Sequence, residues 1–400
     1  MRILQLCNKS PYPPVEGGPI AMHALSRMFL KNNYKLKILA FNSNKQCVSL
    51  ADVPEEYKKE TAIELIDIDL KIKPLQAIYC LLTNRSLHIQ RFISKKFSVR
   101  LKEILTTSDY DVVCLESLYV APYISLIRKY SNAKIFLRAH NVEHKIWERI
   151  AEQTKPSFKK HYLRLLANQL KRYELNALQK TDAVFTISAV DQAYFAAQGL
   201  TIPIRTLAFG IDTDKLPTIS CPTTEINLFS LASMNWIPNL EGLQWFLENV
   251  WMKVHAVHPQ LKLRLAGRNM PETWAKKNYP QVEIVGEVAD AYEFMQSNGV
   301  LIVPLFSGSG IRIKIIEAMS LGKVVITTSI GLEGIDAVDK QHVLIADTAE
   351  DFVKAIDFCL THPQQITAIG ENAAAYVRTH HNERIIAEQL KQWIEKQVFI

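Results

Sequence analysis

The 400-residue sequence predicts an α/β protein with two doubly wound parallel sheets. Apolar segments of strand length alternate with helical segments through most of the chain, and the second half repeats the plan of the first. At roughly 150 residues per domain, this length suggests two or three domains. Apolar residues make up 48% and charged residues 22%, as in ordinary soluble proteins, and no apolar run approaches the ~20 residues of a membrane-spanning helix. The apolar stretch before Asn8 and Lys9 is too short for a signal peptide, so we expect a cytoplasmic protein.

The first half opens with an apolar strand, a loop rich in Pro and Gly, and a helix whose first turn suits Pro19. Short apolar segments predict the strands at 2–7, 35–41, 111–115, 134–137, 183–187 and 204–208. The same criterion predicts second-half strands at 226–231, 261–266, 282–285, 300–304, 324–327 and 343–345. Helices are expected from about Asn239, Ala289, Ile311 and Ala349, and the chain reads as helical from Pro363 to its end.

These elements predict three segments. Residues 1–210 would form an N-terminal Rossmann-like domain, residues 211–375 a second such domain, and residues 376–400 a C-terminal helix able to pack back on the first. Gly, Asp, Pro and Thr accumulate at 210–224, where we expect the join. In such folds ligands bind beyond the carboxyl ends of the strands, so a cleft between the domains would hold the site.

The charge is divided unequally between the halves. Residues 1–210 contain 31 Lys and Arg against 18 Asp and Glu, whereas residues 211–400 contain 16 against 22. The difference either has no functional meaning or indicates that the first half meets an anion, which could be a phosphate-bearing substrate, a membrane surface or a nucleic acid. The six Cys form no Cys-x-x-Cys pair and mostly lie in apolar segments, so we interpret them as reduced core residues.

The strongest local signal runs from Pro304 to Gly322, where a strand ends, a Gly/Ser loop turns and a helix begins. Free N–H groups at such a helix start favour an anion, and Arg312 and Lys314 add two positive charges there. Glu317 follows about a turn and a half later and could accept hydrogen bonds from sugar hydroxyls. The arrangement suits a phosphate next to a ribose; the alternative is a solvated helix start with surface charges.

Two weaker signals follow first-half strands. Gly17 and Gly18 would let the backbone approach a ligand or adopt positive φ, although a plain tight turn explains them equally well. His140 follows the strand at 134–137 and begins a His-x-x-Glu-His string that ends at His144. That string serves zinc proteases only when one helix carries both His, and here a strand precedes His140. A buried His140 without a chemical role is a further alternative.

Other patterns carry less information. Chance explains the Asp-x-Asp strings at 67–69 and 212–214 better than a metal-diphosphate site does, and the sequence has no Walker loop. Residues 155–180 read as an amphipathic basic helix, in which Lys and Arg residues alternate with the apolar Phe158, Tyr162, Leu165, Leu166 and Tyr173. Core packing with a solvated basic face is the default interpretation, and contact with a membrane surface is the alternative.

Taken together, these motifs resemble the retaining glycosyltransferases of family 4, which have the GT-B fold. The similarity rests on the early Tyr-Pro-Pro and Gly-Gly loop, on Arg138-Ala-His-Asn-Val-Glu143, on Ser233-Met-Asn-Trp-Ile-Pro-Asn239, and on the stretch at 308–322. Ala266-Gly-Arg268, Val285-Gly286 and Gly331-Leu-Glu-Gly334 complete it, and the resemblance covers nearly the whole chain. The family carries two glutamates separated by seven residues: Glu317 matches the second, whereas Ser309 stands at the first.

The resemblance implies roles for individual residues. His140 would contact the donor sugar, Arg312 and Lys314 would hold the diphosphate, and Glu317 would bind the ribose. The other donor-binding positions would be Gly17, Gly18, Gly267, Arg268, Gly286, Ser309, Gly310 and Ile311. Asn141 and Glu143 would lie on the acceptor side. No metal would be needed if the cations hold the diphosphate.

The implied activity is transfer of a hexose-type sugar, with retention, from a UDP- or GDP-sugar to an acceptor hydroxyl. The acceptor would be a saccharide or lipid-linked precursor of a bacterial envelope polysaccharide or glycolipid, with possible peripheral contact of the enzyme with anionic membrane and no nucleic-acid partner. A sugar-nucleotide epimerase of GT-B shape and a binding protein without transfer activity remain as alternatives.

Overall fold

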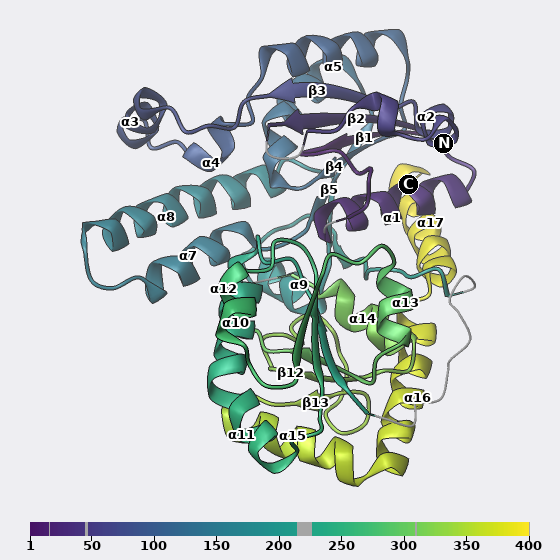
Figure 1. Cartoon of the computed structure of the whole chain (residues 1–400). Coiled ribbons are helices and arrows are strands. Elements are labelled where there is room, and N and C mark those ends of the chain that lie inside the picture. The colour runs from purple at the N-terminus through teal and green to yellow at the C-terminus, as the bar shows by residue number, and fades with distance from the viewer. Residues whose placement is uncertain (16, 45–46, 214–225, 309, 400) are drawn as a thin grey trace. The chain divides into compact units, whose positions relative to one another are not determined.

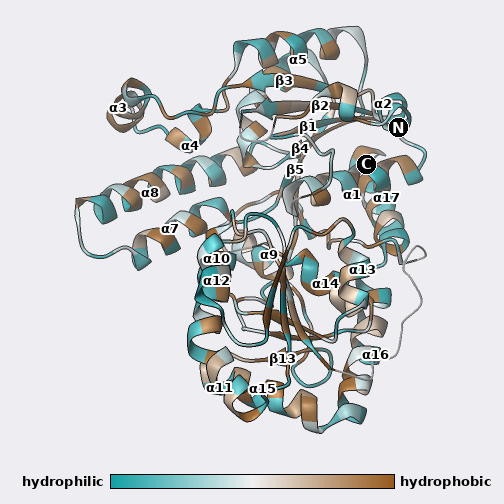
Figure 2. Cartoon of the chain, in the orientation of Figure 1, coloured by the Kyte–Doolittle hydropathy of each residue, from teal (hydrophilic) through white to brown (hydrophobic). Residues whose placement is uncertain are grey.

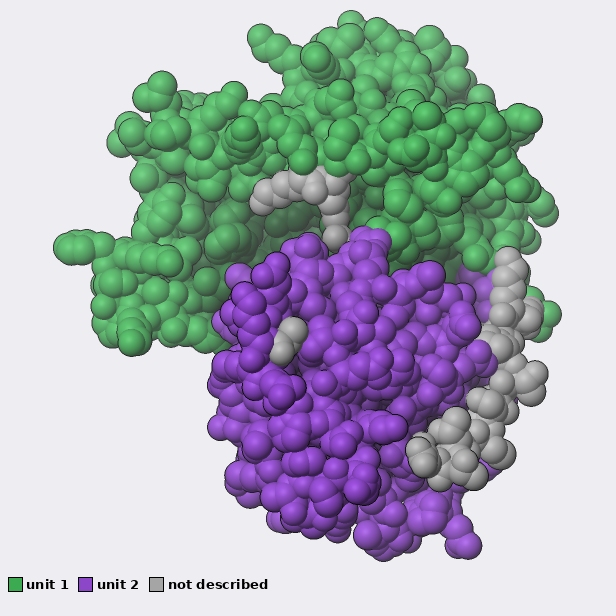
Figure 3. Space-filling model, in the orientation of Figure 1, with its two compact units in different colours: residues 1–209, 384–400 green, residues 210–383 purple. Residues whose placement is uncertain are grey.

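The computed structural model describes residues 1–15, 17–44, 47–213, 226–308 and 310–399. The chain divides into two compact units (Figure 1; Figure 3, green and purple). Unit 1 comprises Met1–Phe209 together with Arg384–Ile400, and unit 2 comprises Gly210–Glu383. The chain therefore returns to unit 1 at Arg384 and not at residue 376, where the sequence suggested the last boundary.

Unit 1 is built on a parallel sheet with strand order β3-β2-β1-β4-β5-β6-β7. Its strands are β1 (Arg2–Cys7), β2 (Lys35–Ser43), β3 (Glu64–Ile68), β4 (Val112–Glu116), β5 (Lys134–Ala139), β6 (Ala183–Thr186) and β7 (Ile204–Thr206). Successive strand residues alternate between two apolar cores, one on each face: Leu4 and Leu6 enter one, whereas Ile3 and Cys7 enter the other. Both faces are thus covered, as a parallel sheet requires.

Serine caps begin three of the helices of unit 1. Ser94, Ser157 and Ser188 each accept a hydrogen bond from a backbone N–H in the first turn of the helix that follows. The helices of unit 1 are α1 (Gly17–Lys31), α2 (Glu55–Thr61), α3 (Pro74–Leu82), α4 (Leu87–Gln90), α5 (Lys95–Thr107), α6 (Ile124–Tyr130), α7 (Glu143–Gln153), α8 (Phe158–Leu178), α9 (Ala189–Ala196) and α17 (Glu383–Phe399), with 3₁₀ turns η1 (Leu50–Asp52) and η2 (Leu118–Tyr123).

Unit 2 repeats the plan with strand order β10-β9-β8-β11-β12-β13, again parallel. Its strands are β8 (Leu228–Leu231), β9 (Leu263–Ala266), β10 (Val282–Gly286), β11 (Val300–Val303), β12 (Val324–Thr327) and β13 (Leu344–Ile345). Its helices are α10 (Ile237–Phe246), the π-helical turn η4 (Leu247–Trp251), α11 (Met252–Val257), α12 (Glu272–Lys277), α13 (Ala291–Gln296), α14 (Ile313–Ser320), α15 (Ala349–Thr361) and α16 (Pro363–His380). Figure 2 shows apolar residues concentrated on the strands.

The expectation of unbroken helix from Pro363 to the end is wrong. The chain leaves the helix at His381 and Asn382, where Ile211 donates its N–H to the His381 carbonyl at 2.7 Å and accepts from the N–H of Glu383 at 2.9 Å. After this break α17 packs on unit 1. Leu390 and Ile394 enter its core, and the Trp393 ring centroid lies 4.7 Å from that of Phe185.

Of the cysteines in the described ranges, Cys7, Cys80, Cys114 and Cys359 are buried and free. Cys47 is exposed, which corrects the expectation of core cysteines at that position. The first Asp-x-Asp string is used locally, since Asp67 accepts a hydrogen bond from Asn42 at 2.9 Å. Asp214 of the second string, and most of the expected join, lie outside the described residues. Among the helices of those ranges, none is both long and apolar enough to cross a bilayer.

Candidate functional site

The carboxyl ends of β1, β4 and β5 are neighbours in unit 1, because β4 pairs with both other strands. The strand order reverses between β1 and β4, which is where a doubly wound sheet opens a crevice for ligands. Glu116 ends β4, and His140 follows β5 directly. The topology therefore brings these two side chains, from separate segments, to the same edge of the sheet.

Glu116 is the centre of a buried polar cluster at this edge. Its carboxylate accepts a hydrogen bond from Gln5 at 3.0 Å and lies 2.6 Å from Nε2 of His140 and 3.7 Å from Nη1 of Arg138. Burial would raise the pKa of Glu116, but Arg138, His140 and Gln5 more than offset it and hold that pKa below its usual value. Because the Glu116 anion fixes Nε2, the His140 ring is held in one orientation and its Nδ1 remains for another partner.

Asn141 and Glu143 continue from His140 into the first turn of α7. Glu143 is buried, and its carboxylate accepts from the hydroxyl of Tyr119 at 2.8 Å. Burial and the neighbouring Glu174 carboxylate raise the pKa of Glu143 to about 7, against the opposing effect of hydrogen bonds from Tyr119 and Asn141. A carboxyl with such a pKa can take up or release a proton near neutrality.

The two histidines of the His-x-x-Glu-His string have different partners. His140 lies in the loop before α7, whereas His144 lies in the helix, fully buried, with Nδ1 2.5 Å from Glu174 and Nε2 2.7 Å from the Tyr194 hydroxyl. They do not share a helix face, so the zinc-protease interpretation has no structural support. Within the described residues no three His, Cys, Asp or Glu side chains are grouped so as to hold a metal ion.

Gly17 and Gly18 open α1 beside the end of β1. Neither adopts positive φ, so the left-handed turn considered for them is not present. A Cβ on Gly17 would meet open space, whereas one on Gly18 would lie 3.0 Å from Cε and 3.3 Å from Nζ of Lys9. The helix N-terminus and the Lys9 ammonium thus lie together, a combination that favours an anion.

In unit 2 the strand order reverses between β8 and β11, and α14 begins in the connection that follows β11. The helix starts at Ile313, two residues later than the sequence suggested, so Arg312 is its N-cap residue and Lys314 lies in its first turn. The loop before it turns through Gly308 and Gly310, whose φ values are 100° and 83°. Ile311 is partly exposed, and Ser309, predicted to bind the donor, lies outside the described residues.

Lys314 donates to the side-chain oxygen of Asn239 at 3.1 Å, and Asn239 in turn donates to the carbonyl of Ser233 at 2.9 Å. Among the described residues no carboxylate forms an ion pair with Lys314. Part of the side chain is accessible, yet protein atoms surround it closely enough that burial, together with Arg312, lowers the pKa of Lys314 to about 7. A nearby anion would reverse that shift, because it favours the protonated ammonium.

Arg312 is buried to 5% exposure, donates to the carbonyl of Gly310, and holds its guanidinium 5.1 Å from the ring centroid of Trp236. Trp236 also lies against Gly308, where a Cβ would come within 2.6 Å of the ring. This packing fixes the guanidinium at the turn between β11 and α14. It explains why Trp236, which lies far away in the sequence, belongs to the same site.

Glu317 is partly buried one turn further along α14. Burial raises its pKa to about 7, against the opposing effect of a hydrogen bond with the Tyr292 hydroxyl. The first turns of α14 therefore present two cations and one easily protonated carboxyl. This grouping is the one the sequence suggested for a phosphate beside a ribose.

The remaining predicted donor positions lie at the ends of β9 and β10. A Cβ on Gly267 would come within 1.9 Å of the Ala232 carbonyl oxygen, and its φ is 135°, so this glycine is required by the backbone itself. Gly286 has a φ of 77°, and a Cβ added to it would meet no other atom of the described residues within 4 Å. Arg268 donates to Glu287 at 2.7 Å, so its charge is already compensated.

Sequence reasoning missed several residues of these two edges, namely Gln5, Lys9, Glu116, Asn239 and Tyr292. Gln5 and Glu116 lie inside apolar strands, where a lone polar residue in a buried strand is itself the signal. Lys9, Asn239 and Tyr292 are ordinary surface residue types, and only the topology shows that they lie beside the predicted residues.

Comparison with known proteins gives a consistent result. Residues 225–362 match the family model described as "Glycosyl transferases group 1". A Klebsiella pneumoniae protein described as an "uncharacterized 44.6 kDa protein in cps region" is 26% identical over 301 residues, which are 71% of this chain and 74% of that protein. The sucrose-phosphate synthase of Thermosynechococcus elongatus superimposes over 100% of this chain and 99% of its own, with a TM-score of 0.72 at 16% identity.

Anabaena Alr3699/HepE, solved in complex with UDP-glucose, covers 99% of this chain and 100% of its own, with a TM-score of 0.68 at 13% identity. These likenesses and the two parallel sheets confirm the GT-B fold expected from the sequence. The match at 225–362 shows that this segment is similar to group 1 glycosyltransferases.

Proposed function

We propose that the chain is a retaining glycosyltransferase of family 4 that moves a sugar from a nucleoside diphosphate donor to an acceptor hydroxyl. The observation that carries the proposal is the start of α14, where Arg312 and Lys314 meet at a helix N-terminus with Glu317 one turn further on. A helix start with two cations suits a diphosphate. The group 1 glycosyltransferase match of residues 225–362 supports the same interpretation.

In this proposal unit 2 binds the nucleotide part of the donor. Arg312 and Lys314 hold the diphosphate with the backbone of Gly308, Gly310 and Ile311 and with Ser309, and the Glu317 carboxylate accepts hydrogen bonds from the ribose. Gly267, Arg268 and Gly286 surround the nucleoside. UDP and UDP-glucose occur in complexes of structural neighbours, which supports a UDP-sugar as the first donor to test and a GDP-sugar as the second.

Unit 1 supplies the sugar and acceptor contacts. His140 contacts the donor sugar through the imidazole edge that Glu116 leaves available, and the α1 N-terminus at Gly17 and Gly18, with Lys9, adds positive potential for the diphosphate. Asn141 and Glu143 act on the acceptor side. Glu116 is a positioning residue, because it acts through His140.

The reaction proceeds on one face of the sugar. The bond between the anomeric carbon and the diphosphate oxygen breaks, a bond from the acceptor oxygen to the same carbon forms, and the acceptor proton passes to the departing diphosphate. The protein positions the two substrates and stabilises the charge that develops on the leaving group. Arg312 and Lys314 supply that stabilisation without a metal ion, so activity should survive EDTA.

We place this activity in bacterial surface polysaccharide or glycolipid synthesis, with a saccharide or lipid-linked acceptor. The similarity to a protein of a Klebsiella cps region supports that setting. We expect the enzyme to work in the cytoplasm in peripheral contact with anionic lipid, and not on nucleic acid. The excess of Lys and Arg in residues 1–210 agrees with such a partner.

The test begins with thermal unfolding in the presence of UDP- and GDP-sugars. A ligand at 100 times its Kd stabilises the folded state by about 2.7 kcal/mol, so a true donor should stand out. The selected donor is then incubated with simple glycoside acceptors, and the product anomer is read by NMR. Conversion of the donor into an isomeric nucleotide sugar would establish the epimerase alternative. Binding without transfer or hydrolysis would establish the binding protein.

A further inference from the structure

Helix α3 exposes most of its large apolar side chains. Leu75, Ile78 and Leu82, at helical spacings i, i+3 and i+7, are 82%, 53% and 82% exposed. Tyr79 on the same helix and Ile72 just before it are exposed as well. The nine-residue helix contains no charged side chain. A contiguous exposed apolar surface of this kind marks an interaction site.

The opposite side of α3 is held by the rest of unit 1. Cys80 is buried in a small cluster with Leu87 and with Leu166 of α8, and Ala77 packs against it. Gln169 of α8 also donates to the Cys80 carbonyl, and Arg172 donates to Asn84 just after the helix. The helix is therefore attached to α8 by its buried side, and these contacts hold its exposed apolar side chains in position.

Helix α8 also exposes large apolar side chains. Phe158 at its first position is 96% exposed, and Tyr162 and Leu165 are exposed further along. Tyr162 precedes the buried Leu166 by one turn, on the side of α8 that meets α3. Figure 2 shows apolar residues on α3 and alternating apolar and polar residues along α8. The default expectation that the apolar residues of this helix pack in the core is wrong for Phe158, Tyr162 and Leu165. It is confirmed for Leu166, which is buried, and for Tyr173, which packs against the core.

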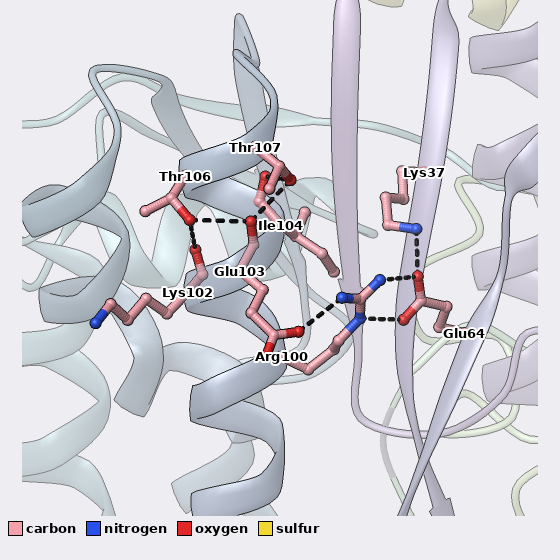
Figure 4. Close-up of polar contacts among 8 residues, drawn as sticks. All are labelled: Lys37, Glu64, Arg100, Lys102, Glu103, Ile104, Thr106 and Thr107. Carbon is pink, nitrogen blue, oxygen red and sulfur yellow. Dashed lines mark hydrogen bonds and ion pairs between the residues drawn. The ribbon is translucent and has the colours of Figure 1, made fainter.

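The charge around this surface is mainly positive, although the Asp69 carboxylate accepts a hydrogen bond from the Lys71 backbone N–H at 3.0 Å. Residues 70–102 contain eight Lys and Arg, residues 153–173 contain six, and neither segment contains Asp or Glu. The side chains of Lys71, Lys73, Arg85, Lys159 and Arg164 are exposed, and among the described residues none of them forms an ion pair. The Arg85 guanidinium lies 5.5 Å from the ring centroid of Tyr79. Arg100, by contrast, binds Glu64 through two hydrogen bonds of 2.6 and 2.8 Å and Glu103 through a third (Figure 4). The basic residues near α3 therefore remain available to an anionic partner.

We infer that α3, with the first turns of α8, docks on an anionic lipid surface, into which Leu75, Ile78 and Leu82 insert while Lys71, Lys73 and Arg85 contact the headgroups. Exposed apolar side chains flanked by unpaired cations fit a fluid interface that offers hydrocarbon beneath anionic headgroups. A nucleic acid would use the cations and leave the aliphatic side chains in water. The inference rests on the membrane contact proposed above and adds the segment that makes it.

The experiment is flotation of the full-length protein with vesicles of phosphatidylcholine alone or with added phosphatidylglycerol. The wild type should float with the anionic vesicles only. Leu75→Ser, Ile78→Ser and Leu82→Ser combined should weaken partitioning on the order of 100-fold, because three apolar side chains no longer leave water. Lys71→Gln, Lys73→Gln and Arg85→Gln combined should weaken it about 100-fold, since each cation near an anionic leaflet contributes about one factor of five.

Matched controls remove the same kinds of side chain elsewhere. One combines Val190→Ser, Val257→Ser and Val338→Ser, whose side chains are 54%, 68% and 51% exposed, and the other combines Lys276→Gln, Lys340→Gln and Lys354→Gln. Both should float like the wild type. A direct readout is a polarity-sensitive label on Leu82→Cys, with Cys47 and Cys221 changed to Ser. Its emission should shift to the blue with anionic vesicles, and a label on Val257→Cys should not respond.

Several results would overturn the inference. Flotation that the serine variant retains, or a label at position 82 that stays in water, would remove α3 from the contact while leaving the membrane contact itself intact. Absence of flotation by the wild type would contradict both the role of α3 and the membrane contact itself, although sugar transfer to a soluble glycoside could still succeed. A dimer that the serine variant dissociates, or tighter binding to RNA than to vesicles, would assign the surface to that partner instead.

Discussion

The two sheet edges occupy the same topological position in their units but differ in how their charges are balanced. At the edge of unit 1, Arg138 and His140 face the buried carboxylate of Glu116. At the edge of unit 2, Lys314 has the neutral Asn239 as its hydrogen-bond partner, and the neighbouring Arg312 lowers its pKa further. The first edge is internally compensated, whereas Lys314 at the second edge has no carboxylate partner among the residues that the structure describes.

This difference indicates separate tasks. A compensated cluster holds its members in fixed orientations and gains little from a charged ligand. A buried ammonium with a lowered pKa makes the free protein less stable than it would be with an apolar side chain, and a bound anion recovers that free energy. Under the proposed function, unit 1 would orient the imidazole that contacts the sugar, and the uncompensated Lys314 of unit 2 would contribute to diphosphate binding.

The largest effect should come from breaking the compensated edge. Glu116→Gln leaves Arg138, which is 1% exposed, without its carboxylate, and loss of one partner of a buried ion pair typically costs 3–5 kcal/mol. Chemical denaturation should show that loss in the free energy of unfolding. Glu56→Gln, an exposed glutamate on α2, should leave it unchanged. If both variants unfold at the same denaturant concentration, Glu116 is not the centre of a compensated cluster.

The strands of both sheets except β3 could be predicted because each is a short, mostly apolar segment, and most of the observed boundaries lie within about two residues of those expected. The strand β3 was missed because Glu64 and Asp67 interrupt its apolar pattern. The grouping of Arg312, Lys314 and Glu317 was predictable as well, since one helix start carries all three. These features are local, and local sequence is sufficient to predict them.

Features that depend on distant segments could not be predicted. Glu116 and Gln5 meet His140 only because β1, β4 and β5 are neighbours. The break at His381 and Asn382 has no Gly or Pro and is made by pairing with Ile211. The exposure of α3 could not be predicted either, because composition alone does not reveal that only its Cys80 side is covered.

The second prediction concerns the uncompensated edge. Lys314→Met should reduce donor kcat/KM by about 10- to 150-fold, because a charge-assisted hydrogen bond contributes roughly 1.5–3 kcal/mol. Unlike Glu116→Gln, it should leave the melting temperature of the free protein unchanged or raise it, since a buried ammonium is removed. Lys253→Ala, at an exposed ion pair, is the control for both measurements. A large fall in melting temperature for Lys314→Met would show that Lys314 stabilises the free protein, which contradicts its description as an ammonium without a carboxylate partner.

Arg312→Ala should reduce the kcat/KM for the donor about as much as Lys314→Met does, because it too removes a charge-assisted hydrogen bond. The Arg312 side chain also packs on Trp236, so its loss should lower the melting temperature as well. Arg312→Lys keeps the charge but not the planar contact, and it should recover part of the donor binding. Wild-type kcat/KM in Arg312→Ala would count against the diphosphate assignment.

A further prediction is that the affinity for the donor is greatest near pH 7. Lys314 must be protonated to attract the diphosphate, so affinity falls as the pH rises above its pKa of about 7. Glu317 must be ionised to accept from the ribose, so affinity falls as the pH drops below its pKa of about 7. Each limb should approach a tenfold loss per pH unit. Calorimetry should show the alkaline limb abolished in Lys314→Met and the acid limb abolished in Glu317→Gln.

The smallest effect should come from a compensated pair on the surface. Hydrogen bonds from Arg100, and the nearby Lys37, lower the pKa of Glu64 to about 2, against the effect of burial (Figure 4). A lowered pKa contributes stability that is complete above the unfolded-state pKa, about 4.3, and is lost as the pH falls through about 2. Because these side chains are partly exposed, solvent screening reduces the contribution to about 1 kcal/mol.

Glu64→Gln should therefore lower the free energy of unfolding by about 1 kcal/mol at pH 7, and the difference from wild type should shrink between about pH 4 and pH 2, where wild-type Glu64 itself becomes neutral. Glu55→Gln removes an exposed ion pair with Lys58 and should cost less than about 0.5 kcal/mol at any pH. Urea unfolding at several pH values measures both. If Glu64→Gln lowered the free energy of unfolding as much as Glu116→Gln does, burial would not determine how much an ion-paired carboxylate stabilises the fold. The contrast between the two sheet edges would then need another cause.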